Sequence, residues 1–280
     1  MLLEFTKMEG LGNDYVYVDC TKNVLENPGE VAKIVSDRHF GVGADGLILI
    51  ESSDKADFFM SMYNADGSRG EMCGNGMRCV ARFVYDKGLT KKTEFGVDTL
   101  AGIKYVSLKV VDGDVKSVTV DMGEPILKGL DIPVTIDKDK VIKEPIDVLG
   151  KAYEITCVSM GNPHAVIFID EDPKNLELEK IGPYFENHAV FPRRVNTEFI
   201  QVLPDGSLNM RVWERGSGET LACGTGACAS VVAASLCGLI GREATVHLLG
   251  GDLHIRWDES DNRVYMEGPA KIVFDGKMNI

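Results

Sequence analysis

The sequence is poor in positive charge. Its 30 lysine and arginine residues are outnumbered by 43 aspartate and glutamate residues, which gives a formal net charge of −13. Binding to nucleic acid or to an anionic membrane needs a basic patch, so we expect neither partner. No cationic segment leads into an apolar stretch near residue 1, and the longest apolar run is too short and too rich in small residues to span a bilayer. We therefore expect a cytoplasmic protein whose partner is a small molecule.

Cysteine is present in an odd number, seven in 280 residues. A chain of this length buries enough apolar surface without disulfide staples, so we expect reduced thiols. The cysteine spacings differ from the short Cys-x₂-Cys pairs of zinc sites, and no histidine pair at helical spacing accompanies them, so no metal site is predicted. Five cysteines are expected to be small buried apolar residues: Cys20, Cys79, Cys157, Cys228 and Cys237.

The other two cysteines belong to an internal repeat. "CGNG" at 73–76 recurs as "CGTG" at 223–226, and "LGNDYVYVD" at 11–19 resembles "MGNPHAVIFID" at 160–170. "ADGLILIE" at 44–51 likewise matches "VNTEFIQV" at 195–202, and the colinear matches are separated by about 150 residues. A repeat this long indicates a duplicated domain. We predict two homologous lobes related by a pseudo-twofold axis, with the active site in the cleft between them. Their predicted bounds are 1–122, joined by a C-terminal strand at 269–280, and 123–268, with "EPILKGLDIP" at 124–133 as the linker.

Hydrophobic alternation predicts strands in both halves, for example at 46–51 and at 198–203. Helices are predicted at 29–39, 76–88 and 227–241, and the last is apolar on nearly every face, which predicts burial. The expected fold is of the α/β (α+β) class, with each lobe a curled, mainly antiparallel sheet or barrel around a central helix.

The repeated order of strand, loop, Cys-Gly-x-Gly and helix places Cys73 and Cys223 at helix N-termini. The helix dipole there favours negative charge, so we expect a lowered thiol pKa. The exposed backbone amides of such a helix start hold a carboxylate. If the pseudo-twofold axis brings both thiols to one substrate, one removes the α-proton and the other returns a proton to the opposite face. This is stereoinversion by general acid–base catalysis.

The motifs "EGLGNDY", "CGNGMRC", "MGNPH" and "WERGSGETLACGTGAC" together resemble those of diaminopimelate epimerases. These are enzymes of lysine and cell-wall precursor biosynthesis that use no cofactor. The resemblance covers the whole chain and implies interconversion of LL- and meso-diaminopimelate without pyridoxal phosphate, commonly by a homodimer. It also implies that Cys73 and Cys223 are the two bases.

The resemblance also implies roles for neighbouring residues. His164 and Glu214 match positions that tune the protonation of the cysteines. The substrate is expected to contact Asn13, Asn64, Gly74, Asn75, Asn162, Asn196, Glu214, Arg215, Gly224 and Thr225. One departure is Gly46, which occupies a position that is glutamine in some relatives and is not expected to contact the substrate.

Two alternatives remain open. A proline or hydroxyproline racemase-type enzyme shares the duplicated architecture and the cysteine pair, although "CGNG" and the Glu214–Arg215 pair differ from its usual pattern. A thiol redox or metal-binding module would predict reversible oxidation of the two cysteines or bound zinc. The asparagines that follow glycine are also common turn residues, and Glu214 with Arg215 also fits an exposed charge pair.

Overall fold

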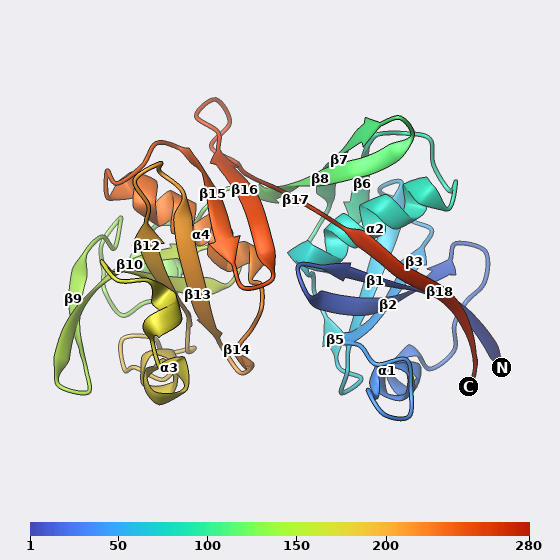
Figure 1. Ribbon diagram of the computed structural model, residues 1–280, viewed down its shortest axis with the longest axis horizontal. Helices are drawn as coiled ribbons and strands as arrows, with labels where there is room; N and C mark the ends of the chain where they lie inside the picture. Colours follow the sequence, from blue (N-terminus) through green and yellow to red (C-terminus); the bar gives the residue numbers. More distant parts are fainter. The chain divides into compact units, whose positions relative to one another are not determined.

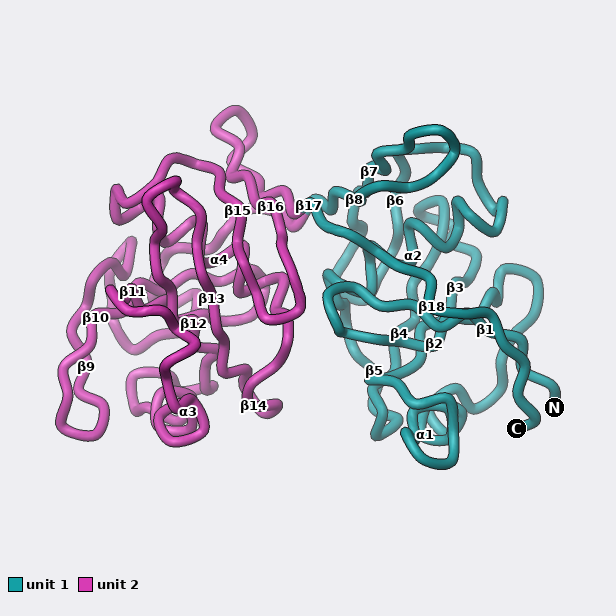
Figure 2. The backbone as a smooth tube through the Cα atoms, in the orientation of Figure 1, with its two compact units in different colours: residues 1–121, 267–280 teal, residues 122–266 magenta.

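The computed structural model describes residues 1–280, and the chain forms two compact units of mixed strands and helices (Figures 1 and 2). Unit 1 comprises Met1–Asp121 and Glu267–Ile280, and unit 2 comprises Met122–Met266. The boundaries fall inside two strands, β8 (Asp114–Gly123) and β17 (Val264–Gly268). No helix combines the length and apolarity that a membrane span requires.

Unit 1 is a sheet with two helices. Its further elements are β1 (Leu2–Gly10), β2 (Asn13–Cys20), α1 (Pro28–Ser36), β3 (Gly46–Glu51), β4 (Phe58–Asn64), β5 (Arg69–Gly70), α2 (Gly74–Asp86), β6 (Glu94–Asp98), β7 (Lys104–Val111) and β18 (Lys271–Asn279). Pairing runs β18–β1–β2–β3–β4–β6–β7–β8. Only β2–β3 and β4–β6 are parallel.

Unit 2 repeats this plan. Its elements are the short 3₁₀ helices η1 (Gly129–Asp131) and η2 (Pro173–Asn175), with β9 (Glu144–Val148), β10 (Lys151–Ser159), β11 (Pro163–Phe168), α3 (Leu178–Glu186), β12 (Asn196–Val202), β13 (Leu208–Glu214), β14 (Gly218–Glu219), α4 (Gly224–Leu236), β15 (Glu243–Leu248) and β16 (Gly251–Trp257). Pairing runs β9–β10–β11–β12–β13–β15–β16, and only β11–β12 and β13–β15 are parallel. The parallel joins therefore fall at the same places in both units.

The strand register shows which residues of the two units are equivalent. Tyr15 pairs with Gly46 between β2 and β3, as His164 pairs with Asn196 between β11 and β12. Leu47 pairs with Tyr63, as Thr197 pairs with Trp213. Equivalent pairs are thus Asn13 and Asn162, Tyr15 and His164, Ile48 and Glu198, Asn64 and Glu214, and Cys73 and Cys223.

One helix in each unit packs against the concave side of the curled sheet. Helix α4 contacts β10, β11, β12, β15 and β16, and in Figure 1 it lies behind the strands of unit 2. Ten of its 13 residues are buried, as its uniformly apolar sequence predicts. Helix α2 packs on β1, β2 and β7. The predicted α/β (α+β) class, with a curled, mainly antiparallel sheet and few helices, is confirmed.

Two segments differ from the prediction. Residues 124–133, expected to be a linker, belong to unit 2: Ile126 pairs with Ser159, and Ile132 is only 2% exposed within the core. Helix α3 was not predicted, because Gly182 and Pro183 interrupt its pattern. A Cβ atom at Gly182 would lie 2.3 Å from the ring of Trp213, so close packing of the helix on β13 explains this glycine.

Candidate functional site

Both repeated cysteines cap the N-terminus of a buried helix. Cys73 is the N-cap of α2 in extended conformation, and the Gly76 N–H donates to its Sγ at 3.4 Å. Cys223 is the N-cap of α4, also extended, and it is 4% exposed. Gly74, Asn75, Gly224 and Thr225 form the first turns, where backbone N–H groups point out of the helix.

The Cys73 thiol is hydrogen-bonded to the side-chain amide of Asn13. The Cys73 thiol donates to Asn13 Oδ1 at 3.2 Å, and Asn13 Nδ2 donates to Asp45 Oδ2 at 2.8 Å. Tyr15, which is also close to the sulfur, is 5% exposed. Burial, reinforced by the neighbouring Cys73, raises the pKa of Tyr15 far above its usual value. Tyr15 is therefore a neutral phenol at physiological pH.

Beside Cys223, a chain of hydrogen bonds leads to a buried pair of a histidine and a glutamate. Cys223 Sγ lies 3.5 Å from Thr225 Oγ1, which accepts from Asn162 Nδ2 at 3.2 Å. Asn162 Oδ1 lies 3.1 Å from His164 Nε2, and His164 Nδ1 lies 2.7 Å from Glu198 Oε1. The chain joins three elements of unit 2, since its members lie before and on β11, on β12 and at the start of α4.

His164 and Glu198 form a pair in the interior of unit 2. Both side chains are fully buried, and His164 Nδ1 lies within hydrogen-bond distance of Glu198 Oε1. Which ring nitrogen donates depends on the tautomer. Removing either partner would leave the other buried without this hydrogen bond, which is destabilising.

The prediction of a lowered pKa is wrong for Cys223. Burial raises the pKa of this thiol well above its usual value, and the nearby carboxylates of Glu214 and Glu198 raise it further. The favourable position at the helix start does not outweigh these effects. Burial also raises the pKa of Glu214, which accepts a hydrogen bond from Thr220.

The two sulfurs thus share a scaffold but differ in surroundings. Where unit 2 has His164, Glu198 and Glu214, unit 1 has Tyr15, Ile48 and Asn64. The imidazole and the two carboxyl groups therefore lie on the Cys223 side of this comparison. Glu198 was missed by sequence reasoning. Its signal was a carboxylate at a position where the other repeat has isoleucine.

The remaining predicted residues occupy defined positions. Asn196 is 3% exposed and bridges the backbone, donating to Pro163 O at 2.8 Å and accepting from the Arg215 N–H at 3.0 Å. The Arg215 side chain is exposed and donates to Arg193 O at 3.1 Å, and Asn64 donates to Ser68 Oγ at 2.9 Å. At Gly46 a Cβ atom would lie 2.1 Å from Tyr63 O, so this backbone admits only glycine there.

Comparison with solved structures identifies the fold. A hydroxyproline epimerase from Agrobacterium vitis matches with a TM-score of 0.69 at 13% identity, over 99% of this chain and 92% of that chain. A phenazine biosynthesis protein of the PhzF family from Enterococcus faecalis matches with a TM-score of 0.72 at 14% identity, over the full length of both. At these identities the likeness establishes the fold alone, and this chain shares it with both proteins.

Sequence comparison is more specific. The diaminopimelate epimerase family model matches residues 5–128 and 156–273. Diaminopimelate epimerase of Acetivibrio thermocellus is 58% identical over 281 residues, covering 99% of each chain. That of Methanococcus maripaludis strain C5 is 57% identical over 278 residues, covering 99% of this chain and all of the relative. The chain belongs to the diaminopimelate epimerase family.

Proposed function

We propose that this protein is an isomerase that interconverts LL- and meso-2,6-diaminopimelate without a cofactor, with Cys73 and Cys223 as its two acid–base groups. The observation that carries the proposal is the duplicated thiol. In a chain of this family, two cysteines cap the N-termini of equivalent buried helices. Stereoinversion requires one proton acceptor and one proton donor acting on opposite faces of a carbon, and a duplicated half-site supplies both.

The proposed step is a proton exchange at the α-carbon. One cysteine, as thiolate, takes the α-proton and becomes a thiol, while the other thiol gives its proton to the opposite face and becomes a thiolate. The reacting carboxylate is held by backbone N–H groups of Gly74 and Asn75 or of Gly224 and Thr225, which stabilise the charge that develops on it. The substrate's ammonium group offsets the burial that opposes ionisation of Cys223, because an opposite charge favours the thiolate.

Polar side chains around the two helix starts are the proposed substrate contacts. Asn13, Asn64 and Asn162 present amides beside the cysteine-bearing loops, and Asn196 holds the backbone of Arg215. Arg215 and Glu214 are the proposed partners of the distal carboxylate and ammonium, because a guanidinium grips a carboxylate bidentately. His164 and Glu214 are proposed to tune the protonation of the cysteines.

Incubation with LL-diaminopimelate in heavy water tests the proposal. We expect the meso isomer to form with deuterium at one α-carbon, and Cys73→Ser and Cys223→Ser each to slow this at least about 100-fold. Proline and trans-4-hydroxyproline are the control substrates. Turnover of proline instead of diaminopimelate would assign the protein to the racemase-type alternative. Full activity of either serine variant would refute the two-thiol mechanism.

We also propose that the enzyme works in the cytoplasm as a homodimer. All seven cysteines are thiols outside any disulfide, which is the form that a catalytic thiol pair needs and that a reducing compartment maintains. Analytical ultracentrifugation of the reduced protein tests the oligomeric state, and a single species at 30.6 kDa would contradict the dimer.

A further inference from the structure

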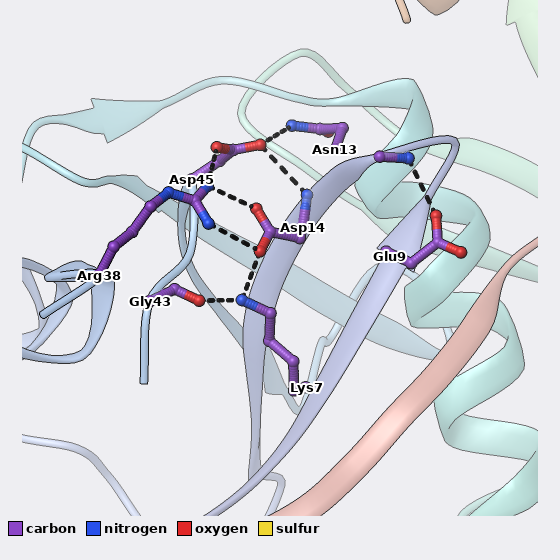
Figure 3. Close-up of polar contacts among 8 residues, drawn as sticks. Lys7, Glu9, Asn13, Asp14, Arg38, Gly43 and Asp45 are labelled. Carbon is purple, nitrogen blue, oxygen red and sulfur yellow. Dashed lines mark hydrogen bonds and ion pairs between the residues drawn. The ribbon is translucent and has the colours of Figure 1, made fainter. Parts of the chain in front are cut away.

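A charged cluster lies next to Asn13 in unit 1 (Figure 3). Arg38 Nη2 contacts Asp14 at 3.0 Å and Asp45 at 2.9 Å, so its guanidinium bridges two carboxylates. Lys7, which is 6% exposed, pairs with Asp14 at 2.5 Å and also donates to the Gly43 carbonyl. Burial alone would raise the pKa of Asp14, but Arg38 and Lys7 outweigh it and hold the pKa below its usual value.

Asp45 connects the cluster to the catalytic loop. Its Oδ1 accepts from Arg38, and its Oδ2 accepts from Asn13 Nδ2 at 2.8 Å and from the Asp14 N–H at 3.1 Å. A carboxylate paired with a guanidinium is a hydrogen-bond acceptor only. The amino end of the Asn13 amide must therefore face Asp45, and its carbonyl oxygen faces Cys73 Sγ at 3.2 Å. Figure 3 shows the Asn13 side chain directed at the Asp45 carboxylate.

The orientation of this amide has a chemical consequence. A carbonyl oxygen accepts a hydrogen bond from a thiol but repels a thiolate, whereas an amide N–H would stabilise the thiolate. We propose that Asp45 is a positioning residue that locks the Asn13 carbonyl toward Cys73 and so keeps Cys73 protonated in the free enzyme. This inference rests on the proposed function of Cys73 as an acid–base group.

Tyr15, Tyr17 and Cys79 are titratable neighbours of Cys73 in unit 1. Tyr15 and Tyr17 on β2 are neutral, since burial raises the pKa of each far above its usual value. Burial likewise raises the pKa of Cys79 on α2 to about 12. In unit 2 the position equivalent to Asp45 is Val195, a core residue, and the equivalent Asn162 faces His164 instead. The hydrogen bond that orients the asparagine amide through a carboxylate at position 45 therefore has no equivalent beside Cys223.

Alkylation kinetics test the inference independently of catalysis. The rate of carbamidomethylation by iodoacetamide is measured at Cys73 by peptide mass spectrometry, between pH 6 and 10, in the full-length protein. Asp45→Asn removes the acceptor-only partner without leaving a cavity, so Asn13 can turn its N–H toward the sulfur. We expect Cys73 to react about tenfold faster near pH 7, with its pH profile displaced to lower pH. Asp45→Val, which places the residue of the other repeat at this position, should have the same effect.

Asp14→Asn is the matched control, because it removes one carboxylate charge from the same Arg38 contact but does not touch the Asn13 amide. We expect its Cys73 rate to stay within about twofold of wild type. In an Asn13→Ala background, Asp45→Asn should add no acceleration. If Asp14→Asn and Asp45→Asn accelerate Cys73 alkylation equally, the cause is loss of a negative charge, and the inference is overturned. An unchanged alkylation rate in both Asp45 variants would also overturn it. Retention of full epimerase activity by Cys73→Ser would instead count against the proposed function and leave the alkylation result standing.

Discussion

Glu198 shows how a single residue distinguishes two otherwise equivalent half-sites. It takes the place that Ile48 has in unit 1, and both side chains lie against the third residue of the central helix, Gly226 or Gly76. Ile48 is apolar, so the Cys73 side needs no compensating group. Glu198 is fully buried and requires His164 as its partner, because a buried carboxylate without a hydrogen-bonding partner is strongly destabilising.

Neutralising Glu198 should make Cys223 more reactive. Its carboxylate is one of the groups that raise the pKa of Cys223, so Glu198→Gln lowers that pKa and increases the thiolate fraction at neutral pH. We expect alkylation of Cys223 to become about threefold to tenfold faster at pH 7.5, measured by peptide mass spectrometry. Thr197→Val, a fully buried neighbour on β12, is the control and should leave the rate unchanged. A slower reaction in Glu198→Gln would contradict this account.

Gly226 is a position where even a methyl group should be harmful. A Cβ atom there would lie 2.6 Å from Glu198 Oε1, 3.0 Å from Met210 Cε and 3.2 Å from Cys223 Sγ. We expect Gly226→Ala to lower the unfolding free energy by about 1–3 kcal/mol and to reduce epimerase activity at least tenfold. Gly241→Ala meets no atom within 4 Å and should leave both unchanged. Urea unfolding and the heavy-water assay provide the two measurements.

Sequence reasoning found the residues that sit in repeated motifs and missed those that reach the motifs from neighbouring strands. Cys73 and Cys223 were identified because a glycine-rich helix start has a local pattern. Asp45 and Glu198 were not, because their contacts with Asn13 and His164 arise from parallel pairing of strands that are distant in sequence. Burial likewise reversed the predicted pKa direction at Cys223, since depth in a core cannot be read from a local motif.

At the scale of elements, the helices and strands with strong periodicity were predictable. β3 matches its predicted bounds, and the central helices α2 and α4 begin two or three residues before the predicted starts, because their glycines are helical. β1 and β10 were not predicted, whereas β18 lies within the C-terminal strand expected at 269–280. β18 is largely exposed along its length, so it carries little hydrophobic alternation, and its position is set by pairing with β1.

Helix α2 should make the protein sensitive to alkaline pH through Cys79. Burial raises the pKa of Cys79 to about 12, so the folded protein keeps a proton that the unfolded chain releases above about pH 8.5. The neutral Cys79 thiol therefore contributes fully to the free energy of unfolding below the pKa that this thiol has in the unfolded chain. That contribution is lost as pH rises toward 12, by about 1.4 kcal/mol per pH unit. Cys79→Ala should therefore flatten the fall of unfolding free energy between pH 9 and 10.5, measured by urea titration. Val80→Ala, which is also fully buried, should lower stability at every pH without changing that slope.

At the scale of the whole molecule, unit 1 is made from both ends of the chain. β18 pairs with β1 from Leu2 to Glu9, and Phe274 packs edge-on against Phe5. Arg78, a fully buried cation on α2, donates to the Pro269 carbonyl, and Arg82 donates to the Ala270 carbonyl. The C-terminal segment thus supports both the sheet edge and the helix that carries Cys73.

Removing residues 269–280 should unfold unit 1 selectively. The truncation removes the strand that pairs with the outer edge of β1, and it removes the carbonyl acceptors of two arginines on α2. We expect the lost interactions to exceed the free energy of unfolding of unit 1. We expect fast hydrogen–deuterium exchange in β1, β2 and α2, with β11, β12 and α4 still protected. Lys277→Ala, which removes only an exposed ion pair with Glu4, is the control and should leave the exchange pattern unchanged. Uniform loss of protection in the truncated protein would show that the two units unfold together.

This arrangement also determines the order of events on the ribosome. All the strands of unit 2 precede β18 in the chain, so the nascent polypeptide holds a complete second unit while the first still lacks an edge strand. β1 is therefore synthesised before the other strands of both units but is among the last to reach its final pairing. The open edge of β1 is the surface that a chaperone would have to shield during translation.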